Sequence, residues 1–116
     1  TFTGAVGVYV RIGRVCHIAI NLEGSNNSLT GDIYVGGLPF TSDNTSGYMP
    51  ANSVPFMEVA NVSLAGGYTN MYGRVNSSDS RLQILQSAGT AHASMAAGGG
   101  LNSGAVLRTS FTYQTT

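Results

Sequence analysis

Apolar and polar residues alternate with a period of two along much of the chain, as expected for half-buried β-strands. In the segment Ala105–Tyr113, the odd-numbered residues from Leu107 to Tyr113 are predicted to face a core and the even-numbered ones solvent. The alternation predicts eight strands: Gly7–Ile12, Arg14–Leu22, Gly31–Val35, Met57–Leu64, Asn70–Val75, Arg81–Gln86, Thr90–Ala96 and Ala105–Tyr113. Turn residues separate nearly all of them, and no segment shows a convincing helical period. We therefore expect an all-β, antiparallel, jelly-roll-like β-sandwich.

The first two strands are predicted to form a tight hairpin with its turn at Gly13. A β-branched row runs from Val8 to Ile12 before the turn, and an apolar row runs from Cys16 to Leu22 after it. We interpret these rows as core. Cys16 is the only cysteine, so no internal disulfide is expected, and its position in the apolar row predicts a buried, inert thiol.

A long connection follows the third predicted strand. Residues 36–56 contain all three prolines of the chain, and we expect a long ordered loop with at most short strand pieces. Loops of this length in compact domains are usually functional or lie against a neighbouring subunit.

The chain carries little charge, which limits its partners. Hydrophobic residues make up 42% of the sequence and charged residues only 9%, and five arginines balance five acidic residues. Without a basic face we expect no nucleic-acid binding, and without a long apolar run we expect no membrane insertion. Low charge protects a monomer poorly against self-association, so we expect an oligomer.

The sequence contains few candidates for catalytic or metal-binding residues. His17 and His92 are the only histidines, and both are expected to be ordinary strand residues. The five acidic residues are spread singly, with no zinc-ligand spacing and no local pair suited to glycosidic cleavage. We therefore predict no catalytic residue, no metal site, no cofactor and no enzyme activity.

Aromatic and amide side chains instead suggest carbohydrate binding. Two tyrosines flank an asparagine in the segment 68–74 and an arginine follows them, and the long loop adds a tyrosine and an asparagine. The candidate glycan-binding residues are Tyr68, Asn70, Tyr72 and Arg74, with Tyr48 and Asn44 as contributors across a subunit boundary. The alternative interpretation is an edge hairpin whose tyrosines cover the rim of the core.

Three segments resemble the C-terminal domains of bacteriophage tailspike and tail-fibre proteins: "GVYVRIGRVCHIAI", "GGLPF" and "LNSGAVLRTSFTYQTT". The matching positions are Gly7, Tyr9, Ile12, Gly13 and Arg14, then Leu38, Pro39 and Phe40, then Ser110, Thr112 and Tyr113. The resemblance spans nearly the whole chain, and each motif marks a position in the fold.

The resemblance implies a homotrimeric β-sandwich at the distal end of a virion tail spike or fibre. Residues 1–116 would then be one C-terminal domain of a larger protein, serving trimer assembly and binding of host-surface glycan, such as capsule or lipopolysaccharide. Arg11 and Arg14 are interpreted as residues that form ion pairs at a subunit boundary. The alternative functions are a polysaccharide hydrolase or lyase, a capsid or decoration jelly roll, and a lectin-like module of a bacterial surface protein.

Overall fold

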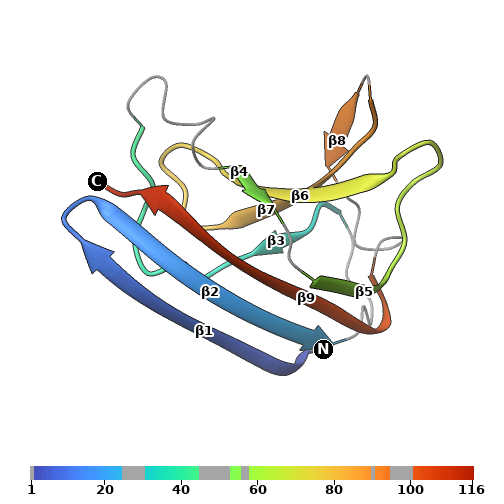
Figure 1. Ribbon diagram of the computed structural model, residues 1–116, viewed down its shortest axis with the longest axis horizontal. Coiled ribbons are helices and arrows are strands. Elements are labelled where there is room, and N and C mark those ends of the chain that lie inside the picture. The colour runs from blue at the N-terminus through green and yellow to red at the C-terminus, as the bar shows by residue number, and fades with distance from the viewer. Residues whose placement is uncertain (1, 25–30, 45–52, 56–57, 90, 95–100) are drawn as a thin grey trace.

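Two antiparallel sheets make up the computed structural model, which describes residues 2–24, 31–44, 53–55, 58–89, 91–94 and 101–116 (Figure 1). The first sheet has the order β1-β2-β9-β5, with bounds β1 Phe2–Ile12, β2 Val15–Gly24, β9 Leu101–Gln114 and β5 Glu58–Val62. The second has the order β3-β7-β6-β4, with β8 also paired to β7; the bounds are β3 Tyr34–Val35, β7 Leu82–Ser87, β6 Asn70–Val75, β4 Ser53–Pro55 and β8 His92–Ser94. The predicted all-β antiparallel β-sandwich is confirmed.

The predicted strands correspond to observed ones, with differences at their ends. β6 has the predicted bounds, whereas the third predicted strand is reduced to the two residues of β3. β4 is one of the short strand pieces expected in the long loop, and Pro55 ends it. Because proline has no N–H to donate, it is tolerated at the end of this edge strand.

The β1–β2 hairpin has the predicted turn, but one of its two apolar rows faces away from the core. Gly13 has a φ of 60° at the first position of a two-residue turn, as type II′ turns require. Ile12 therefore pairs with Val15, and each even-numbered residue of β1 from Gly4 onward lies opposite an odd-numbered residue of β2. Cross-strand partners point to the same face. The row Val6, Val8, Val10 and Ile12 thus lies opposite to the Cys16 row, on the outside.

We call these four residues, Val6, Val8, Val10 and Ile12, the valine row. The side chains are 59%, 62%, 56% and 78% exposed, respectively. The expectation that Val8, Val10 and Ile12 belong to the core was wrong, because the face to which β1 side chains point depends on the turn length and not on the alternation within β1.

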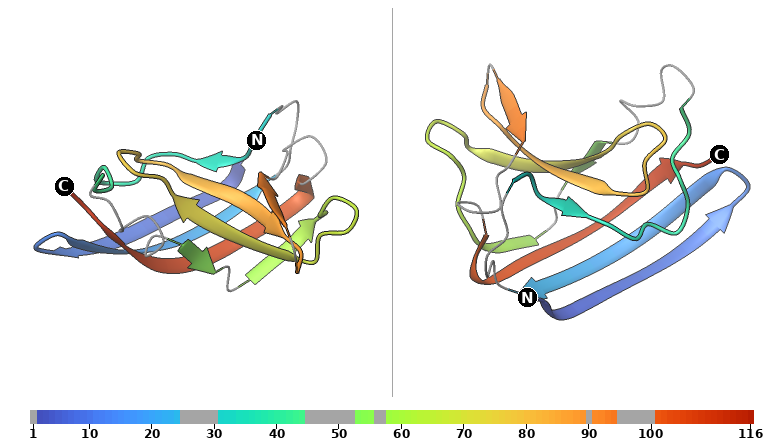
Figure 2. Two further views of the ribbon diagram at one scale, coloured as in Figure 1. Left: turned by 90° about the horizontal axis from the view of Figure 1, so that it is seen from above. Right: turned by 180° about the vertical axis from the view of Figure 1, so that it is seen from behind.

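The core lies between the inner faces of the two sheets. β2 contributes its row from Cys16 to Leu22, and β9 contributes Leu107, Phe111 and Tyr113, as predicted. Val75, Leu82 and Ile84 close the core from the second sheet; Cys16 is fully buried and is a free thiol. Figure 2 shows the two sheets as stacked layers, with β1 at the outer edge of the first.

The C-terminal end of β9 is fastened to the loop that follows β3. The hydroxyl of Tyr113 donates a hydrogen bond to the carbonyl oxygen of Phe40 at 3.0 Å and accepts one from its backbone N–H at 3.3 Å. Arg14 forms an ion pair with buried Asp43, and Arg11 stacks on the Phe40 ring at 4.3 Å. Arg11 also donates to the backbone carbonyl of Thr116 at 3.0 Å. Both arginines therefore stabilise a corner of their own chain, where ion pairs across a subunit boundary had been expected.

The buried Tyr113 hydroxyl makes stability depend on alkaline pH. Burial, followed by the hydrogen bond with Cys16, raises the pKa of Tyr113 from 10.0 to about 12. The folded protein therefore holds this proton more tightly than the unfolded chain. The resulting stabilisation is complete below about pH 10 and is lost as the pH rises towards 12.

We expect the unfolding free energy in urea to fall between pH 10 and pH 12 in the wild type, and to fall less in Tyr113→Phe. At pH 7 the variant should be less stable by about 1–3 kcal/mol, because two backbone groups of Phe40 lose their partner. An equal alkaline loss in both proteins would show that Tyr113 is not responsible.

Candidate functional site

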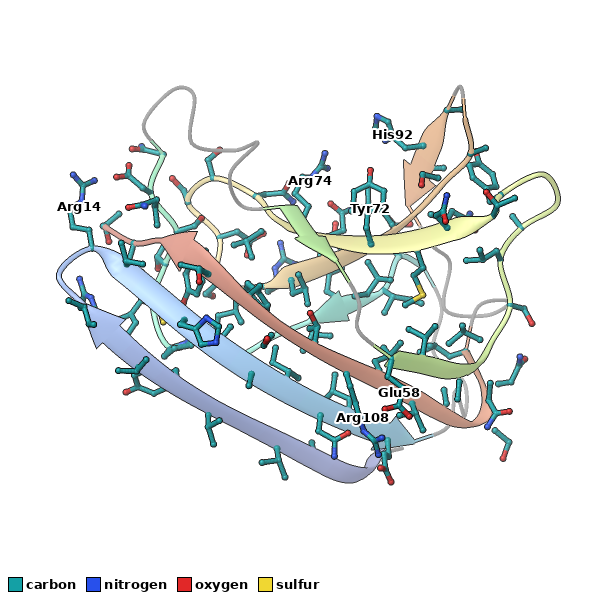
Figure 3. The ribbon with its side chains drawn as sticks, in the orientation of Figure 1. Arg14, Glu58, Tyr72, Arg74, His92 and Arg108 are labelled. Carbon is teal, nitrogen blue, oxygen red and sulfur yellow. The ribbon has the colours of Figure 1, made fainter. Side chains whose placement is uncertain are left out.

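The predicted glycan-binding segment lies on the outside of the second sheet. Alternation along β6 buries Gly73 and Val75 and turns Asn70, Tyr72 and Arg74 to the opposite face, as the sequence predicts. In Figure 3, Tyr72 and Arg74 point away from the first sheet. The structure therefore brings three of the six candidate residues onto one face.

The other three candidates lie elsewhere. Tyr68 precedes β6 in a turn closed by a hydrogen bond from its N–H to the carbonyl of Ala65 at 3.1 Å, so strand alternation does not align it with Tyr72. Asn44 is exposed and follows Asp43, beside the hairpin turn that holds Arg14. Tyr48 lies outside the described residues.

A buried glutamine supports Arg74 from below. Gln83 of β7 lies opposite Arg74 in the strand register, and its side-chain oxygen accepts hydrogen bonds from Arg74 Nη2 and from Asn76 Nδ2, both at 3.2 Å. The Nε atom of Arg74 is buried and has no hydrogen-bond partner among the described residues. The guanidinium is thus held in place on one side by Gln83.

A second aromatic and arginine pair lies on the same face. Tyr34 of β3 is the other cross-strand neighbour of Gln83, so Arg74, Gln83 and Tyr34 form one row across three strands. Arg81 stacks over the Tyr34 ring at 4.4 Å, and its hydrogen bond lowers the pKa of Asp79. We call the surface of Tyr34, Asn70, Tyr72, Arg74, Arg81 and Gln83 the polar face.

Sequence reasoning missed Tyr34, Arg81 and Gln83, because they reach the polar face through the pairing of β7 with β3 and β6. The one available signal was the alternation of the Arg81–Gln86 segment, which places Arg81 and Gln83 on one side of a strand. Nothing in the local pattern shows which strands flank it.

A second polar cluster lies on the outer face of the first sheet. Arg108 donates hydrogen bonds to Asn21 at 2.9 Å, to Glu58 at 2.8 Å and to Glu23 at 2.9 Å. Glu58, and then Glu23, raise the pKa of Arg108. The structure therefore brings together two carboxylates that are far apart in the sequence. Both are bound to one guanidinium on an open sheet face, whereas glycosidase carboxylates flank a sugar held in a cleft.

The histidines and acidic residues form no metal-binding group in the part of the chain that the structure describes. His17 is exposed on β2, and its Nδ1 lies 3.0 Å from the Thr112 hydroxyl, in the position expected of an ordinary strand residue. His92 is exposed on β8 (Figure 3). In the same described residues, no helix is long and apolar enough to span a membrane.

Compared with protein-family models, curated proteins and solved structures, the chain has no match.

The support that Gln83 gives to the polar face can be tested by Gln83→Leu. This change leaves the Arg74 and Asn76 donors without their acceptor, and we expect a loss of about 1–3 kcal/mol in unfolding free energy. Gln83→Glu keeps an acceptor of similar size and should retain most of the stability. Equal unfolding midpoints for wild type and Gln83→Leu in urea would contradict this role.

Proposed function

We propose that the chain is a non-catalytic domain of a bacteriophage tail fibre or tailspike that assembles as a homotrimer and binds host-surface glycan. This proposal unites two surfaces on opposite sides of the sandwich. The first sheet presents the valine row, and the second sheet presents the polar face.

One observation carries the assembly part. Of the eight large hydrophobic side chains exposed in the described residues, six belong to the β1–β2 hairpin; Val6, Val8, Val10, Ile12 and Val15 share its outer face, and Tyr9 lies on the inner one. Contiguous exposed apolar patches on soluble proteins mark interaction sites. The chain has zero net charge, so copies do not repel one another.

The polar face supports the attachment part. It combines the rings of Tyr34 and Tyr72 with the guanidinium groups of Arg74 and Arg81 and the amide of Asn70. Such mixtures of apolar faces and oriented polar groups are typical of small-ligand sites. A single sugar site of millimolar affinity corresponds to about 4 kcal/mol, and three copies on one spike gain about two to four powers of ten by avidity.

A polysaccharide-degrading activity has less support. Asp43, Asp79, Glu23 and Glu58 each pair with an arginine, and Glu23 and Glu58 share Arg108 on an open sheet face. A tail location at the distal end of the virion follows from the resemblance and forms part of the proposal.

The assembly claim predicts a particle of three times 12.0 kDa for the isolated domain in light scattering at micromolar concentration. The same preparation should release no reducing ends or unsaturated products from host capsule or lipopolysaccharide. A stable monomer would remove the assembly function, and turnover by the purified domain would favour the enzyme alternative.

The attachment claim predicts that Tyr72→Ala lowers adsorption of the trimer to host cells by at least about tenfold, since each weakened site counts three times in avidity. Tyr72→Phe keeps the ring and should adsorb more strongly than Tyr72→Ala. The variant Tyr68→Ala tests the contribution of the turn residue Tyr68 separately from that of Tyr72 on β6. If Tyr72→Ala keeps its trimer and melting temperature and adsorbs as the wild type does, the polar face is not the attachment site.

A further inference from the structure

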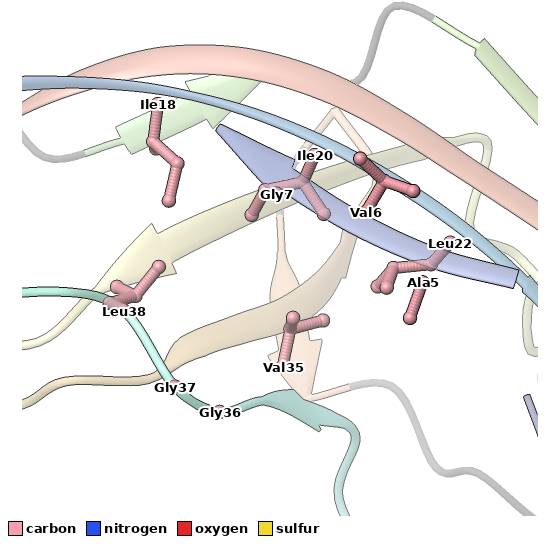
Figure 4. Close-up of a pocket in the computed structure, with 10 residues that line it drawn as sticks. All are labelled: Ala5, Val6, Gly7, Ile18, Ile20, Leu22, Val35, Gly36, Gly37 and Leu38. Atoms are coloured by element: carbon pink, nitrogen blue, oxygen red, sulfur yellow. The ribbon is translucent and has the colours of Figure 1, made fainter. Parts of the chain in front are cut away.

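An apolar cleft opens on the inner side of β1, opposite to the valine row. Its volume is about 260 Å³, and it lies between the β1–β2 hairpin and the segment that follows β3 (Figure 4). The buried side chains of Ile18, Ile20 and Leu22 form one wall, and Val35 and Leu38 lie across from them. Val6 and the exposed Ala5, Gly7, Gly36 and Gly37 line its remaining surface, so it is open to solvent.

We propose that the valine row of one copy inserts into this cleft on the next copy, which makes β1 the contact strand of a closed ring. This inference rests on the proposed assembly function, and it specifies the two surfaces that are in contact between neighbouring copies. β1 is an edge strand of its sheet, with Val8, Val10 and Ile12 on one side and the cleft on the other, while Val6 at the far end of the row also lines the cleft.

The two surfaces are compatible in length and volume. Neighbouring side chains of the valine row stand about 6.6 Å apart, and the β2 wall from Ile18 to Leu22 extends about 13 Å, at about 3.3 Å per residue. The cleft is therefore long enough for two members of the row. An apolar cavity of about 150 Å³ holds the six carbons of benzene, and two valine side chains also have six carbons.

The charges also permit this contact. The residues that line the cleft include no charged side chain. On β2, the partners of Val8, Val10 and Ile12 are Ala19, His17 and Val15, so no Asp, Glu, Lys or Arg lies directly opposite these three residues. Arg11 points to the inner side, where it stacks on Phe40.

The presence of two different apolar surfaces on β1 favours a head-to-tail contact over a two-fold one. A two-fold contact of valine row against valine row would leave the cleft of each copy open. A contact between two different surfaces is heterologous, and such contacts close into rings when the rotation permits. In a ring each copy uses the row once and the cleft once, so both apolar surfaces of β1 are covered.

Two substitutions block one surface each. Val8→Glu places a charge in the row at a side chain that is solvent-exposed in the single chain. Gly7→Ile fills the cleft from β1, where an added Cβ meets only the Ala19 carbonyl oxygen at 4.0 Å and the glycine has no positive φ. Val59→Glu is the control for the same chemical change at the opposite edge of the sheet, where Val59 is 40% exposed and, as the partner of Leu107, points to the inner face.

The masses of the wild type, the three variants and an equimolar mixture of Val8→Glu with Gly7→Ile are measured by light scattering, with melting curves to confirm folding. We expect the wild type and Val59→Glu at three times 12.0 kDa and each blocking variant at 12.0 kDa. In the mixture, the intact row of one variant fits the intact cleft of the other. Its average mass should therefore rise above that of either variant at the same total concentration, towards twice 12.0 kDa.

The outcomes separate this inference from the proposed function. A trimeric wild type whose mass either Val8→Glu or Gly7→Ile leaves unchanged overturns the inference but not the assembly function. Loss of assembly in both variants without any rise in the mixture shows that the surfaces do not meet each other, and also overturns it. A monomeric wild type removes the assembly function together with the inference.

Discussion

The two-residue turn at Gly13 and Arg14 determines which apolar row of the β1–β2 hairpin faces the core and which faces outward. It pairs Ile12 with Val15 and so sends the apolar rows of β1 and β2 to opposite faces of one sheet. The β2 row completes the core, and the β1 row remains outside. An added or removed turn residue would exchange the faces of β1, placing the valine row over the core and Arg11 outside.

The corner around Tyr113 holds the second wall of the cleft in place. Tyr113 and Arg11 both contact Phe40, and Leu38 donates its backbone N–H to the Ser80 carbonyl at 3.0 Å. The segment after β3 is thereby fixed between the C-terminal end of β9 and the turn before β7. The cleft lies between this segment and β1, and Phe40 of the same segment packs edge-on against Tyr9 of β1.

Local alternation was sufficient to predict most strands and the face that carries Asn70, Tyr72 and Arg74, because both depend on a period within one segment. It was insufficient wherever facing or proximity depends on partners distant in sequence. The valine row was assigned to the core for this reason. Gln83 and Tyr34 join the polar face through strand order, and Arg108 meets Glu23 and Glu58 across separations of 85 and 50 residues.

The central claim is that β1 is covered by another copy of the chain, and hydrogen–deuterium exchange of β1 tests it most directly. The backbone amides of residues 5–12 should exchange more slowly in the assembled wild type than in Val8→Glu at the same concentration, while the amides of β6 and β7 exchange alike in both. Equal exchange along β1 in an assembled wild type and in monomeric Val8→Glu would contradict the account.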